Sequence, residues 1–326
     1  IDCGLFQGLK HLRKRNWEDL PQDPDDIDAV VITHSHIDHI GYLPRLFKQG
    51  FRGKVHCNQV TSDLMQIMLR DSAKIQEEEA AYASRKGYSR HKEPQPLYTV
   101  KHAEALFSYF ETHPGNTWID LNASISIRFL NAGHILGSSI VEIQIRGNSQ
   151  TKRIVFSGDL GRYDQPVLRD PESITAADVL FVESTYGDQN NPPISPKQAL
   201  ADTVNEAYQN DGCVLIPAFA LGRTQLVVYY LKELLEEQKI PTMPVYIDSP
   251  MAISVTDLYK KHFNEHKLRE SELEQSVFDY KGLRYCKTAK QSKAINDIKK
   301  HAIIISASGM CSGGRLLHHE FQRLPY

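Results

Sequence analysis

Paired cysteines, long apolar runs and an excess of one charge are all missing from this sequence of 326 residues. The five cysteines are odd in number and form no CxxC pair, which argues against a disulfide framework and indicates reduced thiols. No apolar run reaches the length of about 18 residues that a membrane span needs, and Ile1 opens no signal peptide. We therefore expect no membrane segment and a cytoplasmic location. Lysine and arginine number 38 against 40 aspartates and glutamates, a balance that neither supports nor excludes a nucleic-acid substrate.

The sequence has enough apolar residues, 41%, to build a large core, and its length suggests two domains or one large domain. Three prolines within residues 190–196 mark the best linker candidate. Beyond this segment, strand-like runs alternate with helical stretches. The strands are expected at 213–219, 244–249 and 302–308, and the helices at 222–238, 250–266 and 290–300. This alternation predicts a βαβ domain with a mostly parallel sheet.

The first part of the chain combines helices with short strands. An apolar, β-branched run at 27–33 predicts a buried strand. Helical periodicity is expected at 41–49, 62–87 and 100–112, and strand-like runs follow within 124–134, 139–147, 152–159 and 179–184.

The segment THSHIDH at residues 33–39 is the densest cluster of potential metal ligands in the chain. It directly follows the predicted strand and contains His34, His36, Asp38 and His39. Imidazole and carboxylate groups are ligands that zinc accepts, and a loop at a strand end lets alternating side chains converge. A single histidine would be better explained as a surface or core residue, but that explanation fails for the set.

Further candidate ligands stand at other strand ends. His134 lies in AGHILGS, Asp159 in FSGDLG, and Asp2 in IDCG near the start of the chain. Together with the THSHIDH segment they provide three imidazoles for one metal, Asp38 and His39 for a second, and one carboxylate able to bridge.

These motifs carry a family resemblance that spans essentially the whole chain. THSHIDH resembles the HxHxDH signature of metallo-β-lactamase-fold hydrolases. The segments ESTYGD, IPAFALGRTQ, IDSPMA and SASGMCSGGR are similar to the β-CASP branch, which includes prokaryotic RNases and the endonuclease that cuts pre-mRNA before polyadenylation. The resemblance implies an α/β fold, with an αββα metallo-β-lactamase domain at 1–190 and an inserted β-CASP domain with a parallel sheet at 191–326.

The resemblance also implies a function and a ligand set. The expected activity is zinc-dependent hydrolysis of RNA, most simply single-stranded, as an endonuclease, a 5′ exonuclease or both. His34, His36 and His134 would hold one zinc, Asp38 and His39 the second, and Asp159 would bridge them, so that the pair activates a hydroxide. A DNA-directed nuclease, another hydrolase of this fold and a non-catalytic scaffold are the alternatives. A homodimer or a subunit of a processing complex is also expected.

Two acidic residues are expected to support this chemistry. Asp2 would orient a ligand imidazole, with an ordinary turn aspartate as the alternative. Glu183 matches a family position that supports a histidine protonating the leaving oxygen. The family's remaining histidines would lie beyond Tyr326, and a first strand before Ile1. We therefore expect a fragment that lacks its first strand and its C-terminal return segment, with weaker metal binding and turnover than a full-length chain.

Substrate phosphate contacts are expected at two glycine-containing turns between a strand and a helix. Such turns present free N–H groups and a helix dipole to an anion, although a tight β-to-α connection is a sufficient alternative. The candidates are Ser308, Gly309, Gly313, Gly314, Arg315 and Arg223. Asp248, Ser249 and Pro250 are expected only to start a helix, and His318 and His319 to be surface residues of one.

Overall fold

A computed structural model describes residues 1–87, 93–190, 193–268, 277–309, 311 and 313–324. They form two compact units, the first with Ile1–Gln165 and Arg169–Glu183, the second with Pro166–Leu168 and Ser184–Tyr326. The division falls a few residues before the linker expected at 190–196, of which residues 191 and 192 lie outside the described part. None of the helices in the described ranges combines the length and the apolar character needed to cross a membrane. All five cysteines are free, as predicted.

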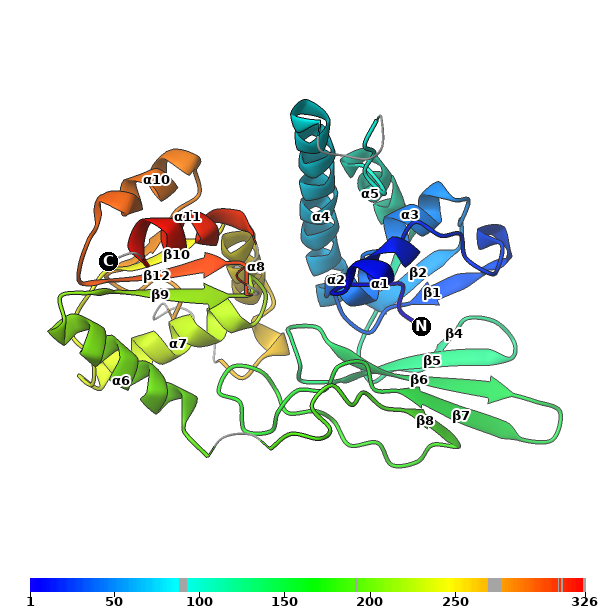
Figure 1. Ribbon diagram of the computed structural model, residues 1–326. Helices are drawn as coiled ribbons and strands as arrows, with labels where there is room; N and C mark the ends of the chain where they lie inside the picture. Colours follow the sequence, from blue (N-terminus) through cyan, green and yellow to red (C-terminus); the bar gives the residue numbers. More distant parts are fainter. Residues whose placement is uncertain (88–92, 191–192, 269–276, 310, 312, 325–326) are drawn as a thin grey trace. The chain divides into compact units, whose positions relative to one another are not determined.

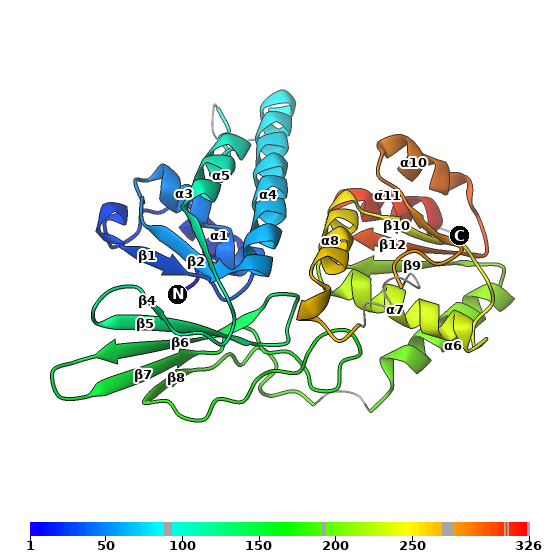
Figure 2. The same cartoon turned by 180° about the vertical axis from the view of Figure 1, so that it is seen from behind.

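The first unit begins with a three-stranded parallel sheet and a layer of helices. The sheet has the order β1-β2-β3, with β1 at Ala29–Val31, β2 at Lys54–Asn58 and β3 at Phe110–His113. Figures 1 and 2 show helices α3, α4 and α5 on one side of it. The helices of this part are α1 (Lys10–Arg15), α2 (Ile37–Ile40), α3 (Leu43–Lys48), α4 (Gln59–Lys86) and α5 (Val100–Leu106). The apolar faces of α2, α3, α4 and α5 share a core with the sheet, around Phe51, Met65 and Tyr98.

A second, five-stranded sheet packs against the other face of the first. Val31 of β1 lies in one buried cluster with Ile127, Phe129 and Val141 of the second sheet. The sheet has the order β4-β5-β6-β7-β8, antiparallel except for the parallel pair β7 and β8. Its strands are β4 (Ile119–Asp120), β5 (Ile125–Asn131), β6 (Ser139–Arg146), β7 (Thr151–Phe156) and β8 (Val179–Phe181). The loops that carry the candidate ligands His34, His36 and His134 follow strands of both sheets.

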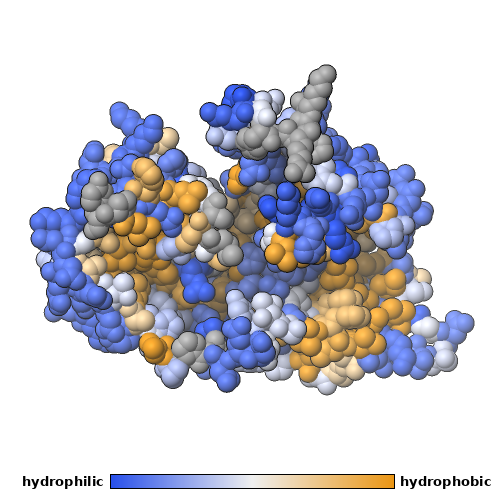
Figure 3. Space-filling model, viewed as in Figure 1, coloured by the Kyte–Doolittle hydropathy of each residue, from blue (hydrophilic) through white to orange (hydrophobic). Residues whose placement is uncertain are grey.

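Strand β8 exposes a row of apolar side chains. Leu180, Phe181 and Val182 keep 55–58% of their surface exposed. Figure 3 shows an apolar surface at lower right, where Figure 1 places β8. The ring of Phe181 stacks on that of Phe156 with centroids 4.6 Å apart, so the exposed strand is held to β7 by an aromatic pair.

The expectation of a helix over 100–112 is wrong at its C-terminal end. Helix α5 ends at Leu106, a 3₁₀ turn covers Phe107–Tyr109, and β3 pairs in parallel with β2 from Phe110 onward. Aromatic and β-branched residues at 110 and 112 suit a strand, and the neighbouring β2 supplies the hydrogen bonds. Periodicity alone gave no sign of this long-range pairing.

The second unit is the predicted parallel βαβ arrangement. Its sheet has the order β11-β10-β12-β9, and every neighbouring pair is parallel. Figures 1 and 2 show α6 and α7 on one face of the sheet and α10 and α11 on the other. The strands are β9 (Cys213–Ala218), β10 (Val245–Asp248), β11 (Leu283–Tyr285) and β12 (Ala302–Ala307). The helices are α6 (Pro196–Gln209), α7 (Arg223–Glu236), α8 (Pro250–Lys261), α10 (Ala289–Ala294) and α11 (Gly314–Arg323).

A buried ion pair joins β5 and β6 and leads to a stability prediction. The carboxylate side chain of Glu142 is 1% exposed and accepts from Arg128 Nε at 2.7 Å, while the guanidinium lies over the ring of Trp118. Replacing Arg128 with Leu leaves that carboxylate buried without its partner. We expect a loss of about 2–4 kcal/mol in the free energy of unfolding, measured by urea denaturation.

The double variant Arg128→Leu/Glu142→Leu is the matched control. It removes both charges and is expected to recover most of the lost stability, because two apolar groups replace the pair. A double variant as unstable as Arg128→Leu alone would show that packing of the arginine, and not the stranded carboxylate, dominates.

Candidate metal centre

Three imidazoles from two loops converge in the first unit. His34 Nε2 lies 3.1 Å from His36 Nδ1, which lies 3.2 Å from His134 Nε2. Ligand atoms of these three residues and of Asp159 all lie within 4.8 Å of one another. His34 and His36 follow β1, whereas His134 follows β5 of the facing sheet. The packing of the two sheets therefore brings together residues that are 98 positions apart.

Asp159 lies between these imidazoles and His39. Its Oδ2 is 3.3 Å from His134 Nε2 and 3.7 Å from His34 Nε2, whereas its Oδ1 is 3.2 Å from His39 Nε2. One carboxylate oxygen thus faces each side. Asp38 is more exposed, and its Oδ2 lies 3.8 Å from His39 Nε2. The structure thus places His34, His36, His134 and Asp159 in one group, with His39 and Asp38 beside the Asp159 carboxylate.

Asp2 fixes the orientation of two of the imidazoles. Its Oδ2 accepts from His39 Nδ1 at 2.6 Å and from Thr33 Oγ1 at 2.8 Å. The hydroxyl of Thr33 has one hydrogen, which it donates to Asp2, so it accepts from His34 Nδ1 at 3.0 Å. Both imidazoles therefore carry a proton on Nδ1 and direct Nε2 toward the cluster.

Close backbone approaches hold the ligand loops. Cys3 N donates to the carbonyl of His39 at 2.7 Å, and a Cβ on Gly4 would lie 1.5 Å from the carbonyl oxygen of Asp38. A Cβ on Gly161 would lie 1.8 Å from the carbonyl oxygen of Gly133, next to His134. These glycines allow the chain segments that carry Asp2, Asp38, His134 and Asp159 to touch.

The contact at Gly161 leads to a prediction. Replacing Gly161 with Ala must push the Gly133–His134 peptide away, which displaces His134. We expect metal affinity to fall at least about tenfold and turnover about 100-fold, since shifts of about 1 Å have such effects at active sites. Gly115→Ala is the control, because its Cβ would find only one neighbour, at 3.9 Å. Unchanged metal binding in Gly161→Ala would contradict the role given to this contact.

The pKa shifts of the histidines differ between the two sides of Asp159. Burial lowers the pKa of His34, and burial together with the His134 charge lowers the pKa of His36 to about 4. Burial also lowers the pKa of His134, which the charges of Asp159 and Glu183 offset only in part. These imidazoles are neutral, the form that binds metals. At His39, burial is outweighed by hydrogen bonds to Asp159 and Asp2, which raise its pKa to about 10, so the field there favours a cation.

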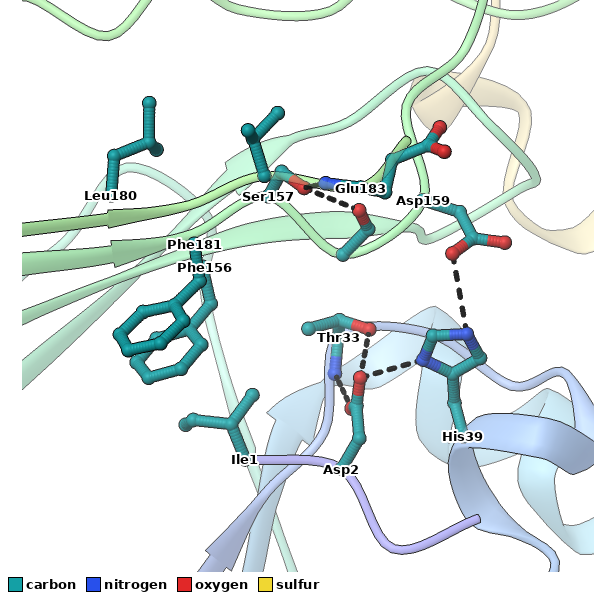
Figure 4. A pocket seen from close by; sticks show the side chains of 12 residues that line it. Ile1, Asp2, Thr33, His39, Phe156, Ser157, Asp159, Leu180, Phe181 and Glu183 are labelled. Atoms are coloured by element: carbon teal, nitrogen blue, oxygen red, sulfur yellow. Dashed lines mark hydrogen bonds and ion pairs between the residues drawn. The ribbon is translucent and has the colours of Figure 1, made fainter. Parts of the chain in front are cut away.

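A cavity of about 490 Å³ opens beside this cluster. Figure 4 shows His39 between Asp2 and Asp159, with the apolar side chains of Ile1, Phe156, Leu180 and Phe181 on the opposite side. Glu183 lines the same cavity. Its backbone N–H donates to Ser157 Oγ at 3.0 Å, and its Oε1 accepts from Leu160 N at 3.3 Å.

The donor set fits a divalent metal ion. Nitrogen atoms 3.1–3.2 Å apart are close to the edge of about 3.3 Å that tetrahedral zinc with imidazole ligands requires. The triad nitrogens are neutral, an anionic carboxylate lies beside them, and Asp2 orients the ring of His34 through Thr33.

Comparisons with known proteins agree with this geometry. The family model of the metallo-beta-lactamase superfamily matches residues 1–217, and that of the Beta-Casp domain matches residues 224–325. The chain belongs to the β-CASP branch of the metallo-β-lactamase superfamily. The resemblance expected from the sequence motifs and the α/β fold class are therefore confirmed.

Curated relatives of this β-CASP chain align along almost its whole length. It is 33% identical over 323 residues to ribonuclease TTHA0252 of Thermus thermophilus, covering 98% of the chain and 69% of that protein. An RNase J-like protein of Methanocaldococcus jannaschii is 29% identical, with 98% and 68% covered. Transcription termination factor FttA of Cenarchaeum symbiosum is also 29% identical, but the chain spans only 48% of its length.

The structure distinguishes the two arginines that were candidates for phosphate binding. Arg315 donates to Asp248 Oδ1 at 2.7 Å and to the carbonyl of Cys286 at 2.9 Å. Arg223, at the start of α7, is exposed, and no carboxylate among the described residues forms an ion pair with it. Arg315 has a structural partner, whereas Arg223 has its guanidinium available. Ser308 and Gly309 follow β12, and Gly313 and Gly314 start α11.

The expectation that His319 lies on the surface is wrong. His319 is fully buried, and its Nε2 lies 2.7 Å from Asp248 Oδ2, which also accepts from Ser292. Ser249 does cap α8, with Pro250 in the first turn, as predicted. Asp248 additionally joins α10, α11 and β10. Its partners come from distant parts of the chain, so a local motif could not reveal this role.

Two residues of functional interest were missed from the sequence. Thr33, within the THSHIDH motif, donates a hydrogen bond to Asp2 and accepts one from His34, so it connects the two side chains. Phe219 is 52% exposed just after β9, and a Cβ on Gly309 would lie 2.8 Å from its ring. From the sequence alone, an apolar residue at a strand end is indistinguishable from a core residue, and only the structure shows that Phe219 is exposed.

Proposed function

We propose that this chain is the catalytic part of a zinc-dependent ribonuclease that hydrolyses phosphodiester bonds of single-stranded RNA. The observation that carries the proposal is the position of Asp159, with one oxygen toward His34 and His134 and the other toward His39. A carboxylate between two sets of ligands suits a pair of metal ions. The names of the relatives support RNA as the substrate.

The ligands divide into two sets around Asp159. His34, His36 and His134 would hold one zinc, and His39 and Asp38 the other. Zinc ions bound there would supply positive charge for the phosphodiester and make a water molecule more acidic. The protein's part is to orient His34 and His39 through Asp2 and Thr33. Burial keeps the imidazoles of the triad neutral. Glu183 would support the group that protonates the leaving oxygen, as the family resemblance implies.

The second unit offers features that suit a single-stranded polynucleotide. Phe219 and Arg223 are both exposed at the carboxyl end of β9, and Thr224 Oγ1 donates to the carbonyl of Phe219 at 2.8 Å. An exposed aromatic ring can stack on a base, and a free guanidinium can bind a phosphate. We propose this pair as an RNA contact.

The test is cleavage of a 5′-labelled single-stranded RNA and of the DNA with the same sequence. We expect RNA cleavage that a chelator abolishes, added zinc restores, and Asp38→Ala/His39→Ala removes. His11→Ala changes an exposed histidine and serves as the control. Cleavage of DNA alone would assign a DNA nuclease. Bound zinc without cleavage of either polymer would favour another hydrolase of this fold, and absence of both metal and cleavage would favour a scaffold.

A further inference from the structure

A second group of potential metal ligands lies in the first unit, apart from the catalytic cluster. His56, Glu111 and His113 bring two imidazole nitrogens and a carboxylate oxygen within 4.8 Å of one another. His56 Nδ1 lies 2.9 Å from His113 Nε2. The group shares no residue with the catalytic centre, and the reaction proposed above does not use it.

Strand pairing brings the three residues together. In the parallel pair β2 and β3, His56 is opposite Glu111 and Asn58 is opposite His113. Alternate residues of a strand share a face, so His56, Glu111 and His113 project to one side. Val55 and Cys57 point the other way, into the core beneath the helices. The parallel register thus gathers the three donors at the edge of the sheet.

The surroundings hold the imidazoles in place and keep them neutral. His56 is 6% exposed, and the ring of His113 lies parallel to that of Phe129, with centroids 6.2 Å apart. Burial lowers the pKa of both histidines. Within the described part of the chain, no lysine or arginine forms an ion pair with Glu111. Two neutral imidazoles and an available carboxylate are a donor set typical of zinc.

We propose that His56, Glu111 and His113 form a second metal site, which binds a divalent first-row cation such as zinc and joins edge strand β3 to β2. The two nitrogens need to separate from 2.9 Å to about 3.3 Å, a change that a small ring rotation provides. The site stabilises the folded first unit and has no part in RNA cleavage. A simple N–H···N hydrogen bond between the imidazoles is the competing explanation.

Zinc titration of a protein with a disabled catalytic centre tests the proposal. In a His36→Ala/Asp159→Ala background, calorimetry is expected to show one remaining zinc per chain, and zinc to raise the Tm by at least about 4 °C. His113→Gln keeps a hydrogen-bonding group beside His56 but removes the ligand imidazole, and is expected to abolish both effects. Glu111→Gln, at the surface, is expected to weaken zinc binding at least tenfold.

Matched controls and the catalytic protein complete the test. His11→Gln and Glu79→Gln change exposed residues elsewhere and are expected to leave zinc binding unchanged. With an intact catalytic centre, His113→Gln is expected to lower the zinc content by one per chain while RNA cleavage stays the same. The proposal is overturned if the background protein binds no zinc, or binds it equally well after both His113→Gln and Glu111→Gln.

Discussion

Replacing Asp159 with Asn is expected to abolish RNA cleavage and to lower the catalytic metal content from two ions to one. The amide keeps the size of the carboxylate but has one oxygen, so it can serve the His134 side or the His39 side, not both. It also removes the negative charge between the ligand sets. Replacing a group that hydrogen-bonds to a metal ligand typically lowers metal affinity or activity by about 10–100-fold. Asp159 lies between both ligand sets, so we expect the rate of cleavage to fall by well over about 100-fold.

The measurements for Asp159→Asn are zinc content by elemental analysis and the initial rate of RNA cleavage. Asp164→Asn is the matched control, since Asp164 is exposed five positions along the same loop and its backbone φ of 58° is one that Asn tolerates. Two catalytic zinc ions and normal cleavage in Asp159→Asn would contradict a bridging role for this carboxylate.

Replacing Asp2 with Asn has the second-largest expected effect. Asp2 has a φ of 55°, which Asn also tolerates, so the change leaves the backbone unstrained. Its two oxygens accept from Thr33 N, Thr33 Oγ1 and His39 Nδ1. An NH₂ group in place of either oxygen must face a donor. If it faces His39, the imidazole moves or shifts its proton to Nε2, which then cannot bind metal.

We expect Asp2→Asn to weaken zinc binding by about 10–100-fold and to lower cleavage in parallel. The Tm of the metal-free protein is expected to change far less, which separates orientation of the ligands from support of the fold. Asp28→Asn, an exposed carboxylate before β1, is the control. Equal loss of stability with and without metal would instead assign Asp2 a purely structural role.

Most residues of the candidate metal centre could be picked out from the sequence because they lie at strand ends. His34, His36, Asp38 and His39 are neighbours in the chain, and flanking glycines mark His134 and Asp159. Local sequence could not show that Asp159 directs one oxygen to each side. That geometry depends on the packing of two sheets, as does the hydrogen-bond relay through Thr33.

The features that could not be predicted depend on contacts between distant segments. Residues 110–112 continue a helical pattern in sequence but pair with β2 in the structure. His319 lies in a polar stretch, yet Asp248 compensates for its burial. Arg315 resembles a phosphate ligand beside its glycines, but a carboxylate 67 positions away already binds it. In each case a partner that is remote in sequence determines the environment.

Anomalous diffraction at the zinc edge, on crystals of the zinc-loaded protein, tests the central claim most directly. The account predicts two peaks, one on each side of the Asp159 carboxylate, with His34, His36 and His134 around the first and His39 around the second. A single peak at this cluster, or two peaks that both lie away from Asp159, would contradict it.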